Sequence, residues 1–271
     1  MSTRSGSDRI LGTAIAVTNV TDTCSQIIDL ARRSEPAYVC FATVHMLAEA
    51  QRDQAVRAAY SCASLITPDG TPVAWCLRLR GHSQAQCVSG PRALPALLGA
   101  AEENNVTVGF YGGRQETLDR MAKVIALRYP RLAVVYACSP PFRPLQPEEQ
   151  AAELGRIAAS GAQLLFVGLG SPKQELWMHR FSPSLSCVCL GVGAAFEFLS
   201  GEKVFPPAWL QAMGLTWLVR LCQEPRRLAR RNLQSPVFAA LFLGEQLTGW
   251  LRSRGPGFLT GGNGRPGGRA S

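Results

Sequence analysis

Three polar or charged side chains stand together in the segment FVGLGSPKQELWM (166–178), where an apolar run gives way to the start of a helix. Pro172 suits the first turn of that helix, and the helix dipole favours Glu175 there. Lys173 is opposed by the same dipole, so it is the informative residue. A lysine beside unpaired backbone amides is understandable if an anion binds at the turn, and a solvated surface lysine is the simpler alternative. This turn is therefore a candidate anion site.

A second candidate is Asp69, which stands between Pro68 and Gly70 directly after the apolar stretch SLIT (64–67). An aspartate in such a loop commonly closes an Asx-turn or caps a helix. Its position after an apolar strand also suits a general base, because ligands in open α/β sheets bind beyond the carboxyl ends of the strands. The residues alone leave both interpretations open.

Glycine-rich or polar turns follow five of the apolar runs, including the two just described. Glycines let backbone amides approach a ligand, and a helix N-terminus adds a partial positive charge, so the combination suits a phosphate. Any α/β protein has glycines at its turns, but three such turns at successive strand ends favour a nucleotide or sugar-phosphate ligand. None of them matches GxGxxG or GxxxxGK[ST], which weighs against NAD and ATP. The turns are TVHM (43–46), TPDG (67–70), YGG (111–113), GLGSPKQE (168–175) and GVGAAFEF (191–198).

The elements that must position these turns alternate between apolar, strand-like runs and helical stretches. Continuous apolar strands alternating with helices predict a Rossmann-like, mostly parallel sheet with helices on both faces, the α/β class. Long helical stretches are predicted over 45–63, 114–130 and 148–160. The expected strands are 37–41, 64–67, 106–113, 132–137, 162–170 and 186–193.

Length and composition describe a globular protein with a sizeable core, with 271 residues, 46% hydrophobic and 17% charged. No apolar run approaches the roughly 18–20 residues of a transmembrane helix, and the first residues show no signal-peptide core, so we expect a cytosolic chain. The nine cysteines are odd in number, form no CxxC pair and are accompanied by only three histidines. They are typical of buried apolar thiols rather than of disulfides or a zinc site.

The net charge of +9 is unevenly distributed. Residues 201–254 contain eight lysines and arginines against three glutamates. Arg220, Arg227 and Arg231 fall near one helical face, although Pro225 interrupts or restarts that helix. A basic amphipathic segment of this kind can lie on anionic lipid or bind phosphates, and a solvated arginine-rich face is the alternative. Nucleic acid is disfavoured, since no aromatic-interleaved basic strand or zinc-finger spacing is present.

Five segments, taken together and in this order, resemble the WecG/TagA/CpsF family of bacterial glycosyltransferases over about residues 37–233. The resemblance implies a compact glycosyltransferase fold of the GT-E type. It also implies an inverting, metal-independent transfer from a UDP-sugar, commonly an N-acetylmannosamine type or a uronate, to an undecaprenyl-diphosphate-linked sugar. Such reactions build teichoic acid linkage units, enterobacterial common antigen, or capsule and exopolysaccharide repeats. The segments are ASLITPDGTPVAW (63–75), GFYGG (109–113), FVGLGSPKQELWM (166–178), GVGAAFEFLSG (191–201) and GLTWLVRLCQEPRRLARR (214–231).

The resemblance implies roles for single residues too. The family's proposed base, the aspartate of its PDG motif, falls on Asp69, and its PKQE glutamine falls on Gln174. The chain departs from the family at three positions. Thr43 stands where the family often has asparagine, and Glu197 where it often has aspartate. Phe205 stands in place of an arginine. No cofactor and no metal ligand are expected, and the chain has no Asp-x-Asp pair. The residues expected to bind substrate are Thr43, His45, Gly112, Gly113, Gly168, Gly170, Pro172, Lys173, Gln174, Gly193, Glu197, Arg220, Arg227 and Arg231.

The chain is expected to divide into an α/β core (1–200), a basic helical appendage (201–254) and a flexible Gly/Pro-rich tail (255–271). The expected partners are a UDP-sugar donor, a lipid-diphosphate-linked sugar acceptor and an anionic membrane surface, which places the protein peripherally on the cytoplasmic face of the cell membrane. A homo-oligomer stays open. So do a non-catalytic, nucleotide-sugar-binding regulatory protein and a nicotinamide-dependent oxidoreductase, although the missing dinucleotide motif disfavours the latter.

Overall fold

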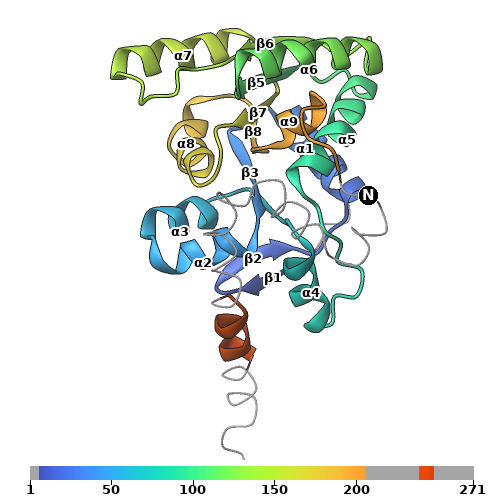
Figure 1. The fold of residues 1–271 in the computed structure, drawn as a ribbon, viewed down its shortest axis with the longest axis vertical. Helices are drawn as coiled ribbons and strands as arrows, with labels where there is room; N and C mark the ends of the chain where they lie inside the picture. Colours follow the sequence, from blue (N-terminus) through green and yellow to red (C-terminus); the bar gives the residue numbers. More distant parts are fainter. Residues whose placement is uncertain (1–5, 206–237, 247–271) are drawn as a thin grey trace, which may run out of the picture.

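A computed structural model of the protein describes residues 6–205 and 238–246. Its central sheet has six parallel strands in the order β4-β3-β8-β7-β5-β6 (Figure 1). None of the six strands carries a charged side chain, as expected where helices cover both faces. The predicted α/β class with a parallel sheet is confirmed. The strands are β3 (Ala37–Ala42), β4 (Leu65–Pro68), β5 (Val108–Gly112), β6 (Val134–Cys138), β7 (Leu164–Gly168) and β8 (Val188–Gly191).

Helices cover both faces of this sheet and enclose two apolar clusters. Alternate residues of β3 face opposite sides, so that Tyr38 and Cys40 enter one cluster and Val39 and Phe41 the other. Helices α2, α3 and α8 lie on one side of the strands and α1, α5 and α9 on the other (Figure 1). The helices are α1 (Val20–Arg33), α2 (Val44–Arg52), α3 (Gln54–Ser61), α4 (Thr71–Leu79), α5 (Gly90–Glu103), α6 (Gln115–Arg128), α7 (Pro147–Ala159), α8 (Lys173–Phe181), followed by a 3-10 turn (Ser182–Ser184), and α9 (Ala195–Leu199).

A short antiparallel hairpin lies outside the main sheet. Its strands are β1 (Ser7–Ile10) and β2 (Thr13–Ala16). The two residues between them, Leu11 and Gly12, both have positive φ (49° and 76°), as a tight two-residue turn requires. Ile15 is fully buried in the same apolar cluster as residues of α4, so the hairpin covers one edge of the core.

The predicted helix over 45–63 is two helices, because Asp53 interrupts it. The N–H of Asp53 donates to the carbonyl of Glu49 (2.9 Å) and closes α2. The carboxylate of Asp53 accepts hydrogen bonds from the N–H groups of Ala55 (2.8 Å) and Val56 (3.2 Å) and so caps α3. The two helices therefore meet at a capped corner, and together they connect the end of β3 to the start of β4.

Residues 238–246 are helical and lie at the same end of the molecule as α4 and the hairpin (Figure 1). Phe238 and Phe242 are buried in the apolar cluster that α4 and the hairpin share. Glu245 forms an ion pair with Arg80 (2.8 Å), and the guanidinium of Arg80 lies 5.5 Å from the centroid of the Phe242 ring. This short helix is therefore packed as part of the core.

Several predicted features lie outside the described residues. They are the arginines at 220, 227 and 231, most of the basic segment 201–254, and the tail 255–271. Within 6–205 and 238–246, no helix combines the length and the apolar character that crossing a membrane requires.

Candidate functional site

The strand order brings five predicted turns to one edge of the sheet. The strands are parallel, so their carboxyl ends share that edge. Along it, the turn of Asp69 after β4 is followed by Thr43 after β3, Gly193 after β8, Gly170 after β7 and Gly113 after β5. Neighbouring strands are about 4.8 Å apart, so three steps separate the ends of β4 and β7 by roughly 14 Å. A ligand that contacts both turns must be extended.

Asp69 is held at the end of β4 by the backbone around it. Its N–H donates to the carbonyl of Ala42 (3.0 Å), so the pairing of β3 and β4 continues to this residue. The N–H of Gly70 donates to the Sγ of Cys87 (3.1 Å). Burial raises the pKa of the Cys87 thiol to about 11, and the negative charge of nearby Asp69 also raises it. Asp69 is half-buried, and its charge lies close enough to the Cys87 thiol to affect its pKa.

Thr43 and His45 begin α2 directly after β3, and both are half-buried. The Oγ1 of Thr43 accepts a hydrogen bond from the N–H of Met46 (3.3 Å), which makes this residue the N-cap of α2. The bond uses a lone pair of the oxygen and leaves the hydroxyl proton able to donate to a ligand. Capping alone accounts for a threonine here, and its predicted contact with a sugar stays a prediction.

Packing within the protein explains the predicted glycines of β5 and β7. A Cβ on Gly112 would lie 2.6 Å from the carbonyl carbon and oxygen of Gly168, and a Cβ on Gly168 would lie 2.5 Å from the ring of Phe196. Gly113, with a φ of +74°, donates its N–H to the carbonyl of Gly168 (3.1 Å). Both Cβ distances are far inside van der Waals contact. The strands and α9 therefore need glycine at these positions whether or not a ligand binds.

Gly170 and Gly193 differ from those glycines, because a Cβ at either position would meet no atom closer than ordinary van der Waals contact. Gly170 has a φ of +78° and no heavy atom within 4 Å of the place where a Cβ would stand. Gly193 has a φ of +55°, and its Cβ position lies 3.4 Å from the Oε1 of Gln174. The sequence predicted Pro172 within the first turn of this helix. In the structure Pro172 is the N-cap residue of α8, one position earlier. Both glycines have positive φ, so the backbone of these two turns, rather than close packing, accounts for glycine there.

Gln174 and Glu175 are buried, although they begin a helix at the end of the sheet. Gln174 is 3% exposed and Glu175 is 0% exposed. The Nε2 of Gln174 donates to the carbonyl of Gly191 (2.6 Å) and to the Oε1 of Glu175 (3.0 Å), and the hydroxyl of Ser171 donates to the same carboxylate oxygen (2.8 Å). Among the described residues, none donates to the Oε1 of Gln174. A buried carbonyl left in that state costs about 1–3 kcal/mol.

Burial is a reason for Glu175 that sequence reasoning missed when it assigned this residue to the helix dipole. Gln174, Glu175, Trp177 and Met178 are the buried positions of α8. Their i, i+1, i+3, i+4 spacing is that of one helical face, so the apolar Trp177 and Met178 were the available signal. The carboxylate also acts on β3, because after burial the charge of Glu175 is the second cause that raises the pKa of the Cys40 thiol.

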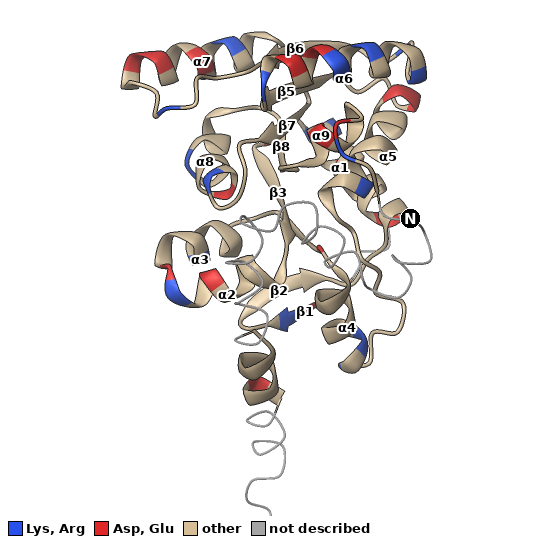
Figure 2. Ribbon diagram, viewed as in Figure 1, with Lys and Arg blue, Asp and Glu red and all other residues tan. Residues whose placement is uncertain are grey.

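The other predicted charged residues have different surroundings. Lys173 is exposed at the first position of α8. Glu197, on α9, forms an ion pair with Lys203, and the N–H of Lys203 donates to the carbonyl of Glu197 (2.9 Å). Figure 2 shows that charged residues gather on the helices, above all on α6 and α7, and that the central strands carry none. Of the cations predicted to bind phosphate, Lys173 lies within the described residues, and the arginines at 220, 227 and 231 lie outside them.

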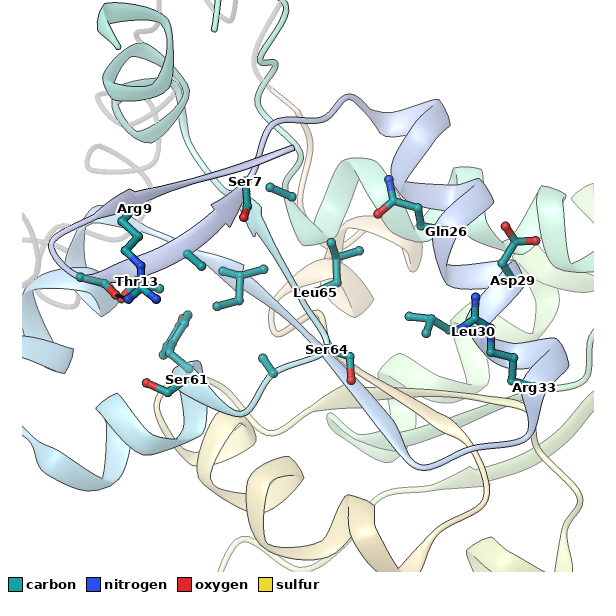
Figure 3. Close-up of a pocket in the computed structure, with 16 residues that line it drawn as sticks. Ser7, Arg9, Thr13, Gln26, Asp29, Leu30, Arg33, Ser61, Ser64 and Leu65 are labelled. Atoms are coloured by element: carbon teal, nitrogen blue, oxygen red, sulfur yellow. Dashed lines mark hydrogen bonds between the residues drawn. The ribbon is translucent and has the colours of Figure 1, made fainter. Parts of the chain in front are cut away.

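Two cavities of about 440 and 430 Å³ lie away from this edge. The first lies between the hairpin, α1 and the start of β4, with Arg9 on the hairpin side and Asp29 and Arg33 on the α1 side (Figure 3). The second lies between α1 and α5. Neither is lined by a predicted site residue. The described part of the chain also holds no group of three His, Cys, Asp or Glu placed to bind a metal.

Known proteins resemble this chain over most of its length. A model described as "Glycosyl transferase WecG/TagA/CpsF family" matches residues 9–252. An N-acetylglucosaminyldiphosphoundecaprenol N-acetyl-beta-D-mannosaminyltransferase of Bacillus subtilis (strain 168) is 26% identical over 187 residues, which cover 69% of this chain and 71% of the relative. The protein of that name from Bacillus spizizenii (strain ATCC 23059 / NRRL B-14472 / W23) is 26% identical over 212 residues, 78% of this chain and 80% of the relative. The family match begins within the hairpin and ends beyond the helix at 238–246.

Proposed function

The chain belongs to the WecG/TagA/CpsF family of glycosyltransferases, and from that premise we propose that it transfers a sugar from a UDP-sugar to a hydroxyl of an undecaprenyl-diphosphate-linked saccharide. The printed names of both relatives support this, since each joins an N-acetylmannosaminyl group to N-acetylglucosaminyldiphosphoundecaprenol. We propose N-acetylmannosamine, a uronate or a related hexose as the transferred sugar. The product would enter the synthesis of a cell-surface polysaccharide.

The proposed reaction is a single displacement with Asp69 as the general base. The acceptor hydroxyl oxygen attacks the anomeric carbon, its proton passes to the carboxylate of Asp69, and the bond from that carbon to the diphosphate oxygen breaks, so that UDP leaves. A single displacement inverts the anomeric configuration. The observation that carries the proposal is the strand order, which puts Asp69 and the turn of Lys173 on one edge, roughly 14 Å apart at the level of the strands. A nucleotide diphosphate-sugar is extended enough to span such turns.

The departing UDP gains negative charge, and cationic side chains are proposed to stabilise it. Lys173 is exposed at the start of α8, where the helix N-terminus adds a partial positive charge. Arg220, Arg227 and Arg231 are proposed as further cations of the same site. Because the chain has no Asp-x-Asp pair, these side chains are proposed to act in place of a divalent metal. Electrostatic stabilisation of this kind is often the largest single term in catalysis.

The assay that tests the function is incubation with a panel of UDP-sugars and a short-chain lipid-diphosphate-linked acceptor, read by mass spectrometry. Asp69→Asn should lower turnover by about 10²–10⁴-fold while UDP-sugar binding persists, since a general base contributes about that much. Asp53→Asn is the matched control, because Asp53 is also a half-buried aspartate but caps α3, where asparagine caps equally well. Unchanged turnover in Asp69→Asn would reject the base. If Gln174 also proved dispensable, a non-catalytic nucleotide-sugar-binding protein would be the better description.

We also propose that the basic segment 201–254 closes over the lipid diphosphate and rests on an anionic membrane surface, which would place the protein peripherally at the cytoplasmic face. Phe238 and Phe242 are buried in the core, so deleting the whole segment would also remove core side chains. Replacing Arg220, Arg227 and Arg231 by glutamine is the sharper test. Sedimentation with anionic vesicles should fall in the triple variant, and undiminished sedimentation together with full activity on vesicle-borne acceptor would reject the proposal.

A further inference from the structure

The loop that joins α4 to α5 runs along β4, the end strand of the sheet, on the side away from β3. The N–H of Val88 donates to the carbonyl of Pro68 (2.8 Å), and the Oγ1 of Thr67 donates to the carbonyl of Val88 (3.1 Å). One residue earlier in this loop, the Sγ of Cys87 accepts a hydrogen bond from the N–H of Gly70 (3.1 Å). Cys87 therefore contacts the residue that directly follows the proposed base.

The turn that carries Asp69 is held from two sides. On the side of β3, the N–H of Asp69 donates to the carbonyl of Ala42 (3.0 Å). On the side of the loop, Pro68 and Gly70 form the bonds just described. The bonds at Asp69 and Pro68 join backbone groups, whereas the bond at Gly70 uses the side chain of Cys87. The type of residue at position 87 thus decides whether the N–H of Gly70 has this acceptor.

The start of α4 adds little support to this turn. Its N-cap residue is Gly70, and no side chain among the described residues caps the helix. Gly70 has a φ of +97° and a ψ of 144°, a conformation that L side chains rarely adopt, so the backbone turns sharply directly after Asp69. An acceptor for the N–H of Gly70 fixes this turn and with it the direction in which the side chain of Asp69 leaves the backbone.

We propose that Cys87 is a positioning residue for the proposed base: it accepts the N–H of Gly70 and so fixes the turn from which Asp69 presents its carboxylate to the acceptor hydroxyl. The inference rests on the proposed function. A general base must lie within hydrogen-bond reach of the proton that it removes. A misplacement of about 1 Å can lower a rate by about a hundredfold. In this role Cys87 acts through Asp69 and transfers no proton itself.

A thiol suits this position because it accepts a hydrogen bond without adding a charge beside Asp69. Burial and the negative charge of Asp69 raise the pKa of the Cys87 thiol to about 11. The thiol is therefore neutral at pH 7. A carboxylate in its place would also accept the N–H of Gly70, but a second negative charge would raise the pKa of Asp69. A base with a raised pKa would be protonated over a wider range of pH.

The test is steady-state kinetics of wild type, Cys87→Ala and Cys87→Ser with the UDP-sugar and the short-chain acceptor. Cys87→Ala removes the acceptor for the N–H of Gly70 and should lower kcat by about tenfold to hundredfold, with the KM for the UDP-sugar within about twofold of wild type. Cys87→Ser keeps an acceptor atom and should retain most of the wild-type kcat. Cys76→Ala is the matched control, because it removes a buried thiol from α4 and leaves the Gly70 bond in place, so its kcat should stay at the wild-type value.

Two further measurements keep the test meaningful if Cys87→Ala is unstable. Amide hydrogen exchange at Gly70, followed by NMR, reports on the bond itself and should be faster than wild type in Cys87→Ala but not in Cys87→Ser. Cys87→Asp keeps an acceptor and adds a charge, so the acid limb of the pH profile of kcat/KM should move to higher pH. Cys87→Asn, which has the same size as Cys87→Asp and no charge, should leave that limb in place.

Two results would overturn the inference alone, given a wild type that transfers sugar and an Asp69→Asn variant that loses turnover. One is a Cys87→Ala variant with the wild-type kcat. The other is a Cys87→Ser variant that loses kcat as strongly as Cys87→Ala although its Gly70 amide remains protected. A wild type that transfers no sugar, or an Asp69→Asn variant with unchanged turnover, would instead reject the proposed function or its base, and the inference with it.

Discussion

Replacing Gly168 by alanine should destabilise the protein, because the end of β7 passes against the ring of Phe196. The added Cβ would lie 2.5 and 2.7 Å from the Cε2 and Cδ2 atoms of that ring. Phe196 is 1% exposed, and its ring meets that of Phe110 edge-on with centroids 5.7 Å apart, so it has no free direction in which to move. Carbon atoms pack at about 3.5–4.0 Å. Either the ring or the strand must therefore shift by roughly 1 Å.

Overpacking a well-packed core by one methyl group costs about 1–3 kcal/mol, and the size of this clash places Gly168→Ala at the upper end, about 2–3 kcal/mol. For a domain of this size that loss lowers the Tm by roughly 4–12 °C. Gly170→Ala is the matched control from the same turn. It has open space at the Cβ position and a φ of +78°, so it should cost only the strain of a left-handed residue, about 1–2 kcal/mol.

The assay is urea unfolding of four proteins: wild type, Gly168→Ala, Phe196→Leu and the double variant. Leucine lacks the outer ring atom that the new Cβ would strike, so Gly168→Ala should cost less in the Phe196→Leu background, with a coupling free energy of about 1–2 kcal/mol. A Gly168→Ala variant within about 0.5 kcal/mol of wild type, or an equal cost in both backgrounds, would refute the packing argument. Gly168 would then be reserved for a ligand, and the variant would lose UDP binding at unchanged stability.

The remaining predictions concern two ion pairs. Arg80→Ala should increase hydrogen exchange in 238–246 and cost about 1–2 kcal/mol, because it removes the ion-pair partner of Glu245 and the cation over Phe242, and leaves Glu245 the N–H of Leu11. Arg80→Lys keeps the charge and should lie between. Equal exchange in all three proteins would contradict this. The hydrogen bonds from Arg143 and from the Gln146 backbone lower the pKa of Glu149 to about 2. Because the pKa is lowered in the folded state, this stabilisation is present above the ordinary value of 4.5 and is lost as the pH falls toward 2. NMR titration of the Glu149 carboxyl measures this pKa. In Arg143→Gln the titration midpoint of Glu149 should return toward 4.5.

Local patterns in the sequence were enough for the class of fold and for most elements. The apolar runs that became β5 and β7, and the helical spacing of α6 and α7, depend on residues within one or two turns of each other. The break at Asp53 was missed, because helical propensity continues through it and the cap forms only where the chain turns back from β3 toward β4. The helices α1, α4, α5 and α9 were not singled out either. For α9, with five residues, the helix depends on packing against the sheet, but in α1 the buried Cys24, Ile27, Ile28 and Ala31 recur at helical spacing, so the signal for that helix was present in the sequence.

The sequence by itself determined which residues stand at the turns after the strands, Asp69 and Lys173–Gln174 among them, since a turn and its flanking apolar run are neighbours in the chain. Only the tertiary structure decided their order along the sheet edge, through pairings between strands far apart in sequence. It also decided that Gly168 faces Phe196 and that Glu175 is buried against the amide of Gln174. A helix dipole is a local property and explains a glutamate at any exposed helix start. Burial of that glutamate, and the bond from Gln174 to Gly191, exist only once α8 packs against β8.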